Sequence, residues 1–494
     1  FVLPLGAAVS PLFSGTRNAL FSPSHIFRIT RYTFRVALGS TLIAAAAGIP
    51  AAAFTANRSF PGRKLFLSLS AVPLSIPPLI IALGFVSIFG MNGLLNAAAV
   101  RIFNLNKAPF TFLYSYAGVI IAQGFYNFPL VMAVVSEAWE RIPSDEQDAA
   151  RMLGAGKARI FFTVTIHKLA PAAGAACIPV FLYCFFSFMI VLLFGTVGGT
   201  TLEVEIYQAA RTTLDFRTAS LRALIETACA MAAVFAYSRV LLGTPHTSAS
   251  GVSHVRTPVG CGRYESRPES AAERVMFTVL ALIIIVFFVF PLAGIFAGAF
   301  RQRGGILSLV RIFTDSGFGR ALAGTLLTAP VTAFLCCVTA FVYASLLRTK
   351  DPAARNTMMQ TLPMLPMAVS SVVMGYGMNM LMHRGTVIAL IASQTALAWP
   401  VAFRQIYASL CAVPEQALDA SRMMSRFPPD TVFRIMIPSA KRSILSSFGF
   451  CFAISMGDTT LPLVLGIPRF DTLALYTYRL AGSYRFAQSC ACGA

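Results

Sequence analysis

The chain contains little charge, little histidine and no Cys-x-x-Cys pair. Charged residues make up 12% of its 494 residues, whereas ordinary soluble proteins carry about 25%. There are five histidines and ten cysteines, and no two cysteines stand in a Cys-x-x-Cys pair. The low charge excludes a soluble enzyme and a disordered tail. The scattered thiols exclude a disulfide scaffold, since most lie in apolar runs where free cysteine acts as a small apolar residue.

Several functional motifs are also missing. No segment reads Gly-x-x-x-x-Gly-Lys-Ser/Thr, the loop that holds nucleotide phosphates, so the chain alone is not expected to hydrolyse ATP. No acid–base or metal-ligating cluster stands out, which argues against an enzyme. The net charge of +20 comes without a groove-reading motif. We therefore expect no nucleic-acid partner, because basic residues beside apolar spans meet anionic lipid headgroups instead.

What the sequence does contain is apolar runs long enough to cross a bilayer. Hydrophobic residues make up 56% of the chain, and a helical span needs about 20 mostly apolar residues in succession. The runs are too long and too uniform for the alternating strands of a membrane barrel. We therefore predict an all-α membrane protein, a polytopic helical bundle. Spans are expected at 36–56, 65–90, 116–137, 172–195, 222–242, 275–299, 321–346, 360–382, 386–408 and 443–466, with a shorter apolar run at 1–14.

The chain is predicted to consist of two copies of one unit. The segment QGFYNFP from Gln123 returns 271 residues later as QTALAWP from Gln394, and the same offset carries Asp148 onto Asp419. Six predicted spans separate Asp148 from Asp419. Because six is even, both copies insert in the same orientation, as parallel repeats about an axis along the membrane normal do.

The repeat also predicts the domain organisation. Residues 1–242 form the first transmembrane half, the polar Gly-, Ser- and Pro-rich residues 243–273 form a linker, and residues 274–494 form the second half. Nearer the N-terminus the offset drifts, and we pair Thr41 with Thr325 and Pro4 with Pro291. On this alignment each half has about six helices, with the first span partial and the last span missing here.

Two inter-span loops are long and organised, and they are repeat partners. Each opens with proline and acidic residues that suit a helix N-terminus. A short helix follows, with small residues that allow another surface to approach closely. The first loop carries Asp148, Ala149 and Ala150, and then Gly154, which can leave the helix at positive φ. The matching residues of the second loop are Asp419, Ala420, Ser421 and Ser425.

These loops resemble the hallmark of the inner-membrane permeases of bacterial ABC importers, which is Glu-Ala-Ala, three residues, Gly, nine residues and Ile-x-Leu-Pro. Both copies keep this spacing and end in VTIH from Val164 and IMIP from Ile435. They depart from it with Asp for Glu twice, Ser425 for the Gly and His167 for the Pro. Permeases with two halves fused in one chain include the ferric-iron and the thiamine permeases.

The resemblance implies a multi-pass transport subunit of the bacterial inner membrane rather than an enzyme. Its two loops would be cytoplasmic coupling helices that dock on two copies of a separate ABC ATPase. Mg-ATP would belong to that partner, so we expect no cofactor on this chain. A periplasmic or lipid-anchored binding protein would deliver the solute at the outer face, and membrane lipid is the remaining expected partner.

The substrate and its route are less constrained by the sequence. The segment SMGDTTLPLVLGIPRFDTLALYTYRLAGSYR from Ser455 looks most like the thiamine permeases, so we expect thiamine, with ferric iron, polyamine, sulfate or phosphonate as alternatives. An acid within the membrane indicates a functional site by default. Asp458 is therefore a candidate for the translocation pathway, and the alternatives are a helix-end cap or a partner for an arginine or lysine between the halves. Gln123, Asn127 and Gln394 are further candidates, although Gln123 and Gln394 also suit hydrogen bonds between helices.

Two other functional classes remain open from the sequence alone. An ion-coupled secondary transporter is also built from parallel repeats, but it would not need paired cytoplasmic loops of matching spacing. A decayed, inactive permease would look the same as an active one. The discriminating observation is whether Gly154 and the small residues beside it matter to transport.

Overall fold

The computed structural model describes residues 2–13, 23–58, 63, 76–140, 142, 144–195, 199–242, 271–300, 312–350, 359–360, 362–424 and 427–494. Regular structure in these residues is helical, without a β-strand, which confirms the predicted all-α fold. The last helix of the first half ends at Leu242 and the first helix of the second half begins at Ala271. The rest of the predicted linker, 243–270, lies outside the described residues.

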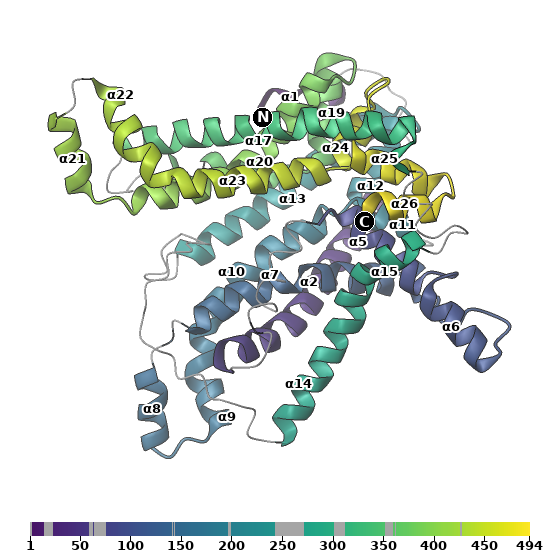
Figure 1. Ribbon diagram of the computed structural model, residues 1–494, viewed down its shortest axis with the longest axis horizontal. Helices are drawn as coiled ribbons and strands as arrows, with labels where there is room; N and C mark the ends of the chain where they lie inside the picture. Colours follow the sequence, from purple (N-terminus) through teal and green to yellow (C-terminus); the bar gives the residue numbers. More distant parts are fainter. Residues whose placement is uncertain are drawn as a thin grey trace.

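The helices follow one another in two similar series (Figure 1). The first half contains α1 (Val2–Val9), α2 (Pro23–Asn57), α5 (Pro78–Phe89), α6 (Leu94–Phe103), α7 (Tyr116–Glu140), α8 (Ser144–Met152), α9 (Lys157–Ile160), the π-helix η4 (Phe161–Thr165), α10 (Ile166–Phe185), α11 (Met189–Phe194), α12 (Leu202–Arg211) and α13 (Phe216–Leu242). The second half contains α14 (Ala271–Ile284), the π-helix η5 (Ile285–Val289), α15 (Phe290–Phe300), α17 (Ser316–Lys350), the 3₁₀-helix η6 (Leu362–Ala368), α19 (Ser371–Met382), α20 (Val387–Cys411), α21 (Glu415–Met424), α22 (Pro428–Thr431), the π-helix η7 (Val432–Met436), α23 (Ile437–Gly457), α24 (Thr460–Leu465), α25 (Leu473–Gly482) and α26 (Phe486–Gly493).

Most of the predicted spans are present as long apolar helices. Eight described helices are long and apolar enough to cross a membrane, and η6 with α19 forms a further pair that is bent by 96°. This pair breaks the predicted run at 360–382, and two further predicted runs are also broken rather than continuous. The run at 172–195 is interrupted between α10 and α11, and the run at 443–466 is interrupted at Asp458, where α23 ends and α24 follows.

The repeat is visible in equivalent hydrogen bonds of the two halves. In the first half the Leu202 amide donates to the Thr33 hydroxyl at 3.0 Å, and in the second the Leu473 amide donates to the Thr325 hydroxyl at 2.7 Å. Thr325 is therefore the counterpart of Thr33. The predicted pairing of Thr41 with Thr325 is wrong, because several threonines and small residues recur along these two helices and letters alone do not fix their register.

The two halves exchange their first spans. The α14–η5–α15 segment of the second half packs on the first half, where the rings of Phe54 and Phe277 lie 4.9 Å apart and those of Phe128 and Phe288 lie 5.4 Å apart. In the same way α1 of the first half packs on α19 of the second. Such close crossings depend on small residues that let helix backbones meet.

Two glycines make these crossings possible. A Cβ atom added to Gly84 of α5 would lie 2.1 Å from the Pro291 carbonyl oxygen, which is far inside van der Waals contact. A Cβ atom added to Gly377 of α19 would lie 2.1 Å from the Pro4 carbonyl oxygen. The two contacts are equivalent, so they confirm the predicted pairing of Pro4 with Pro291. They also show that each half depends on the other for part of its core.

The buried side chains form three main clusters. One consists of residues from α2, α7 and α10 together with the exchanged first span of the second half. Another lies entirely within the second half, among α17, α20 and α23. The largest is shared, because α5, α11 and α12 of the first half meet α19 and α24 of the second half there. The halves are thus joined by one common core, the second half has a separate core of its own, and the core of the first half includes the exchanged span.

Candidate functional site

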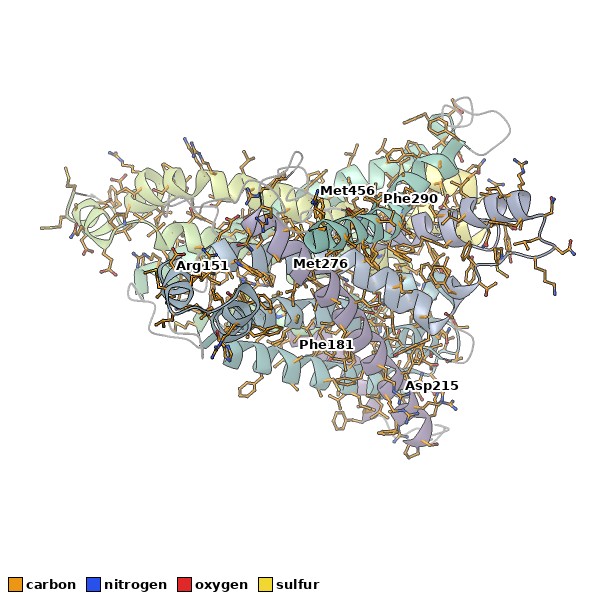
Figure 2. All side chains as sticks on the ribbon, turned by 90° about the horizontal axis from the view of Figure 1, so that it is seen from below. Arg151, Phe181, Asp215, Met276, Phe290 and Met456 are labelled. Carbon is orange, nitrogen blue, oxygen red and sulfur yellow. The ribbon has the colours of Figure 1, made fainter. Side chains whose placement is uncertain are left out.

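The two organised loops project from the same end of the molecule. Helices α8 and α21 lie at one end of the long axis, whereas α6, α11, α12 and α25 lie at the other (Figure 1). Arg151 of α8 and Asp215, which lies between α12 and α13, are accordingly found toward opposite ends in Figure 2. Parallel repeats predict this placement of the loops at one membrane face.

The first loop has the geometry that its sequence predicts. Asp148 is exposed on α8 and pairs with Arg151 at 3.2 Å, one helical turn away. Gly154 has φ of +80°, its amide donates to the Arg151 carbonyl at 2.9 Å, and the Ala155 amide donates to the Ala150 carbonyl at 3.0 Å. These two bonds form a Schellman motif with glycine at the left-handed position, so Gly154 ends the helix as expected.

The second loop is similar but is fastened differently. Asp419 and Ala420 are exposed on α21, and the Ser421 hydroxyl donates to the Thr431 hydroxyl at 3.1 Å, which ties α21 to α22. Leu418 is buried in the core of the second half. Ser425, the counterpart of Gly154, lies outside the described residues.

Both loops expose apolar side chains that the motif did not single out. Met152 and Leu153 are 90% and 89% exposed, and their repeat counterparts Met423 and Met424 are 89% and 88% exposed. Large apolar side chains left in water at equivalent positions mark an interaction surface. We call these four residues the apolar pairs. The matched Arg-Met dipeptides at 151–152 and 422–423 were the signal that could have found them.

In each half an arginine forms contacts at the helix ends next to the loop. Arg63 pairs with Glu140 at the end of α7 at 2.6 Å and also donates to the Thr55 carbonyl of α2 at 2.7 Å. In the second half Arg348 of α17 donates to the Val413 carbonyl at 3.1 Å and lies 3.7 Å from Glu415. These contacts join helix ends at the base of each loop.

The predicted polar residues of the first half lie buried between helices. The Ser40 hydroxyl of α2 donates to the Gln123 Oε1 atom of α7 at 2.9 Å, and the Asn127 amide donates to the Gln123 carbonyl at 3.0 Å and meets the Cys184 sulfur at 3.5 Å. Gln123 therefore does bond between helices. The Gln123 Nε2 atom is buried without a hydrogen-bond partner among the described residues.

The second half has the matching arrangement with an acid added. The Gln394 Oε1 atom accepts from the Thr332 and Ser455 hydroxyls at 3.3 and 2.7 Å, and its Nε2 atom donates to Asp458 Oδ2 at 3.1 Å. Asp458 Oδ1 also accepts from the Thr460 and Leu461 amides at 3.0 and 3.2 Å. The Asp458 carboxylate thus caps α24, which was the alternative to a pathway role.

Asp458 lies next to a contact between the halves. A Cβ atom added to the preceding residue, Gly457, would lie 2.5 Å from Cγ of Pro77. Pro77 is the residue before α5 of the first half. The helix N-terminus of one half therefore approaches an acid of the other half.

A second group of acids lies beside the N-terminus of α19, the counterpart of α5 in the second half. The sequence did not predict this group. Glu203 of α12 and Glu226 of α13 are 1% and 0% exposed. Their carboxyl groups adjoin one another beside Ser370, which caps the N-terminus of α19 in the other half. Glu226 falls inside the predicted 222–242 span, so the sequence displayed one intramembrane acid there. Only the folded chain shows that Glu203 stands beside it.

The described residues contain no group of three His, Cys, Asp or Glu side chains placed to hold a metal ion. This arrangement supports binding and conformational change rather than the making or breaking of covalent bonds. Two bundles share a core at one end, carry acids at the helix N-termini between them, and expose paired docking helices at the other end. A polytopic helical fold of this kind is typical of a membrane transport protein.

Comparison with known proteins finds one matching family model and several similar permeases. Residues 48–244 match the family described as "Binding-protein-dependent transport system inner membrane component". The chain is similar to the "Thiamine transport system permease protein ThiP" of Brucella abortus (strain 2308), with 29% identity over 94% of this chain and 83% of the relative. It is also similar to the proteins of the same name from Escherichia coli (strain K12), with 24% identity over 94% of this chain and 86% of the relative, and from Haemophilus influenzae, with 24% identity over 98% and 89%.

The chain is thus similar to inner membrane components of binding-protein-dependent transport systems over residues 48–244, and to the thiamine permeases over nearly its whole length. It is a fused two-half permease of an ABC importer, and a multi-pass protein of the inner membrane. The predicted class, transport role and location are therefore confirmed.

Proposed function

We propose that this chain carries thiamine across the inner membrane, with the energy of ATP hydrolysis delivered by a separate ATPase through α8 and α21. The observation that supports the coupling best is the pair of exposed, repeat-related docking helices at one end of the fold. Similarity to thiamine permeases over nearly the whole chain supports the substrate.

The positions of the acids suit a cationic solute. Thiamine carries a permanent positive charge on its thiazolium ring. Asp458 lies beside the start of α5, and Glu203 and Glu226 lie beside the start of α19, so each half presents acid to a helix of the other. Buried acids between moving elements of a membrane protein mark substrate or ion routes more often than structural sites. In this proposal Gln123, Asn127 and Gln394 hold the neighbouring helices in register along the route.

The proposed coupling rests on the two loops acting as a pair. Asp148 and Asp419 face outward, where basic side chains of an ATPase can meet them. The exposed residues Ala149 and Ala420 leave room for close approach, with Ala150 and Ser421 next to them. The apolar pairs would be buried on docking. In this proposal Gly154 and Ser425 give each docking helix its exit from the interface.

The arrangement of the cores supports an inward-facing resting state. The shared core joins α11, α12 and α24 at the end opposite the docking helices (Figure 1). Toward the docking helices each half has its own core. Drawing α8 and α21 together on a closing ATPase pair would bring these separate ends together and loosen the shared end. The solute, delivered by a binding protein at the outer face, would then enter between the halves.

Affinity purification from the native membrane in mild detergent, followed by mass spectrometry, tests the proposed assembly. We expect two copies of an ABC ATPase for each chain, together with a binding protein that binds thiamine. Purification of the chain without an ATPase would favour the ion-coupled class. A co-purified binding protein that takes ferric iron and not thiamine would contradict the substrate and leave the coupling intact.

The docking surface itself is tested by changing one apolar pair. Full burial of a leucine or methionine side chain contributes about 1.5–3 kcal/mol. Replacing Met152 and Leu153 with serine should therefore weaken ATPase binding to the detergent-purified chain by roughly 100-fold at the low end of that range. Ile102→Ser is the matched control, because Ile102 is 73% exposed on α6 at the opposite end of the molecule. Equal affinity of the double variant and the control would refute docking at α8.

A further inference from the structure

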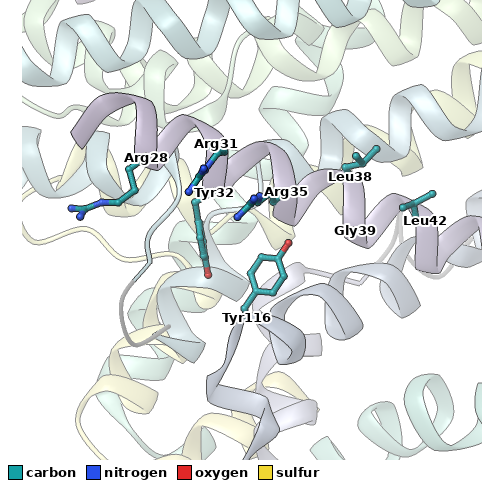
Figure 3. A pocket seen from close by; sticks show the side chains of 8 residues that line it. All are labelled: Arg28, Arg31, Tyr32, Arg35, Leu38, Gly39, Leu42 and Tyr116. Carbon is teal, nitrogen blue, oxygen red and sulfur yellow. The ribbon is translucent and has the colours of Figure 1, made fainter. Parts of the chain in front are cut away.

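The outer end of α2 carries a basic groove that transport does not explain. Its volume is about 700 Å³, and its lining comes only from residues of α2 and α7 in the first half. The groove therefore does not lie between the halves. Its eight lining residues are shown in Figure 3 and comprise three arginines, two tyrosines and three apolar positions: Arg28, Arg31, Arg35, Tyr32, Tyr116, Leu38, Gly39 and Leu42.

The arginines of the groove lack anionic partners in the described part of the chain. Arg31 and Arg35 are exposed, and neither forms an ion pair or hydrogen bond with a described residue. Arg28 contacts the His25 ring at 2.9 Å, which supplies no negative charge. The nearest acid to His25 is Glu205 at 3.9 Å, and Glu205 is already paired with Arg222 at 2.9 Å. No acid among the described residues therefore compensates the three positive charges of the groove.

The wall opposite the arginines is rigid. The Tyr32 and Tyr116 rings meet edge to face with centroids 5.6 Å apart. The Tyr32 ring also lies so close to Gly199 that any side chain there would clash with it. Figure 3 shows the arginine side chains along α2 and the Tyr116 ring facing them across the groove. Such a wall keeps the pocket open at low entropic cost to a ligand.

The depth of the groove follows from the sequence of α2. No charged residue occurs from Val36 to Asn57, a stretch of about 20 residues that matches the hydrocarbon thickness. Arg35 therefore stands at the boundary of the hydrocarbon, and Arg31 and Arg28 lie one and two turns farther out, at headgroup level. On the same face Leu38 and Leu42 are 56% and 62% exposed and continue the groove inward at the depth of the acyl chains.

The repeat provides an internal comparison. Because Thr33 corresponds to Thr325, Arg28 corresponds to Arg320, whereas Arg31 and Arg35 correspond to Ala323 and Leu327. The second half thus keeps one basic residue at this depth and lacks the other two. The charges run against the usual bias of basic residues toward the cytoplasmic side, so orientation in the membrane does not account for them.

We infer that this groove binds one anionic phospholipid, with the phosphate held by Arg31 and Arg35 and an acyl chain lying along Leu38 and Leu42. Phosphate and guanidinium groups form paired, charge-assisted hydrogen bonds, and basic pockets on transmembrane helices bind anionic headgroups. Tyr116 lies at the interfacial level that suits tyrosine. An acidic loop of a binding protein would satisfy the arginines but would leave the leucines below them uncovered, so the membrane is the better occupant.

The test is a native mass spectrometry titration of the full detergent-purified chain with phosphatidylglycerol, and with phosphatidylcholine in parallel. Each arginine at headgroup level contributes about fivefold to the affinity. The double variant Arg31→Gln/Arg35→Gln should therefore bind the first phosphatidylglycerol about 25-fold more weakly, whereas Arg320→Gln should bind it as the unchanged chain does. Arg31→Lys/Arg35→Lys should keep most of the affinity, which separates loss of charge from misfolding.

Three results would overturn the inference. The first is equal phosphatidylglycerol affinity in the double glutamine variant and the Arg320→Gln control. The second is full displacement of the lipid by millimolar glycerol phosphate, which would make the groove a site for soluble phosphate. The third is crosslinking of a photoreactive residue at position 31 to the binding protein instead of to lipid in native membranes.

Discussion

The exchange of first spans predicts how the protein responds to one added methyl group. Gly84 and Gly377 sit where the backbone of another helix crosses, and an added Cβ atom would fall on the Pro291 or the Pro4 carbonyl oxygen. Neither oxygen belongs to a flexible side chain. The helices must therefore move apart by about 1 Å to restore van der Waals separation.

The cost can be estimated from packing. Overfilling a well-packed core by one methyl group costs about 1–3 kcal/mol, and clashes with backbone belong at the upper end. Gly84→Ala and Gly377→Ala should each lower stability by about 3 kcal/mol, offset by up to about 1 kcal/mol of improved helix propensity. Because the unfolding entropy scales with chain length, we expect a fall of about 2 °C in the thermal midpoint of each variant.

The assay is thermal unfolding of the purified chain in one detergent and at one scan rate, because membrane proteins commonly unfold irreversibly. Gly319→Ala and Gly449→Ala are the matched controls. Both glycines lie in helices, and nothing lies within 4 Å of a Cβ atom placed on either. These controls should leave the midpoint unchanged or raise it slightly. Equal midpoints for Gly84→Ala and Gly319→Ala would refute the exchange of first spans.

Three further predictions concern transport. Asp148→Lys combined with Asp419→Lys should abolish uptake in intact cells while the protein remains in the membrane, and unchanged uptake would refute the coupling assignment. Glu226→Gln should raise the KM of thiamine uptake about tenfold, since one negative charge near the cation is lost. The thermal midpoint should stay equal or rise, because two buried acids no longer adjoin. An unchanged KM would place Glu226 outside the route. Arg348→Met should lower stability by about 2 kcal/mol and weaken the stimulation of ATPase activity by substrate-loaded binding protein, whereas loss of stability with full stimulation would make the arginine purely structural.

The sequence predicts the helical class, the paired loops and the equivalence of Gln123 with Gln394, because these depend on composition and on a constant offset. It does not predict the exchange of first spans, since the Gly84 and Pro291 contact joins residues that no local pattern relates. The sequence also misaligns α2 with α17, its counterpart in the repeat. There the repeated pattern of small residues and threonines permits several alignments, and the equivalent hydrogen bonds of Thr33 and Thr325 in the folded chain fix the true one.

The candidate site likewise contains features that the sequence predicts and features that it does not. Gly154 is predictable because a helix that must stop needs a residue at positive φ. The closeness of Glu203 to Glu226 is not predictable from the sequence. The two residues lie on neighbouring helices, α12 and α13, and meet only once these helices have packed. The capping of α24 by Asp458 likewise depends on a break in α23 that an apolar run does not reveal.

The most direct test of the central claim is uptake of labelled thiamine by proteoliposomes that contain this chain, its ATPase and its binding protein. We predict that thiamine accumulates only when all three proteins and hydrolysable ATP are present, and that Asp148→Lys/Asp419→Lys removes the accumulation. Accumulation driven by an ion gradient without ATP would contradict the account, as would ATP-driven uptake of ferric iron with none of thiamine.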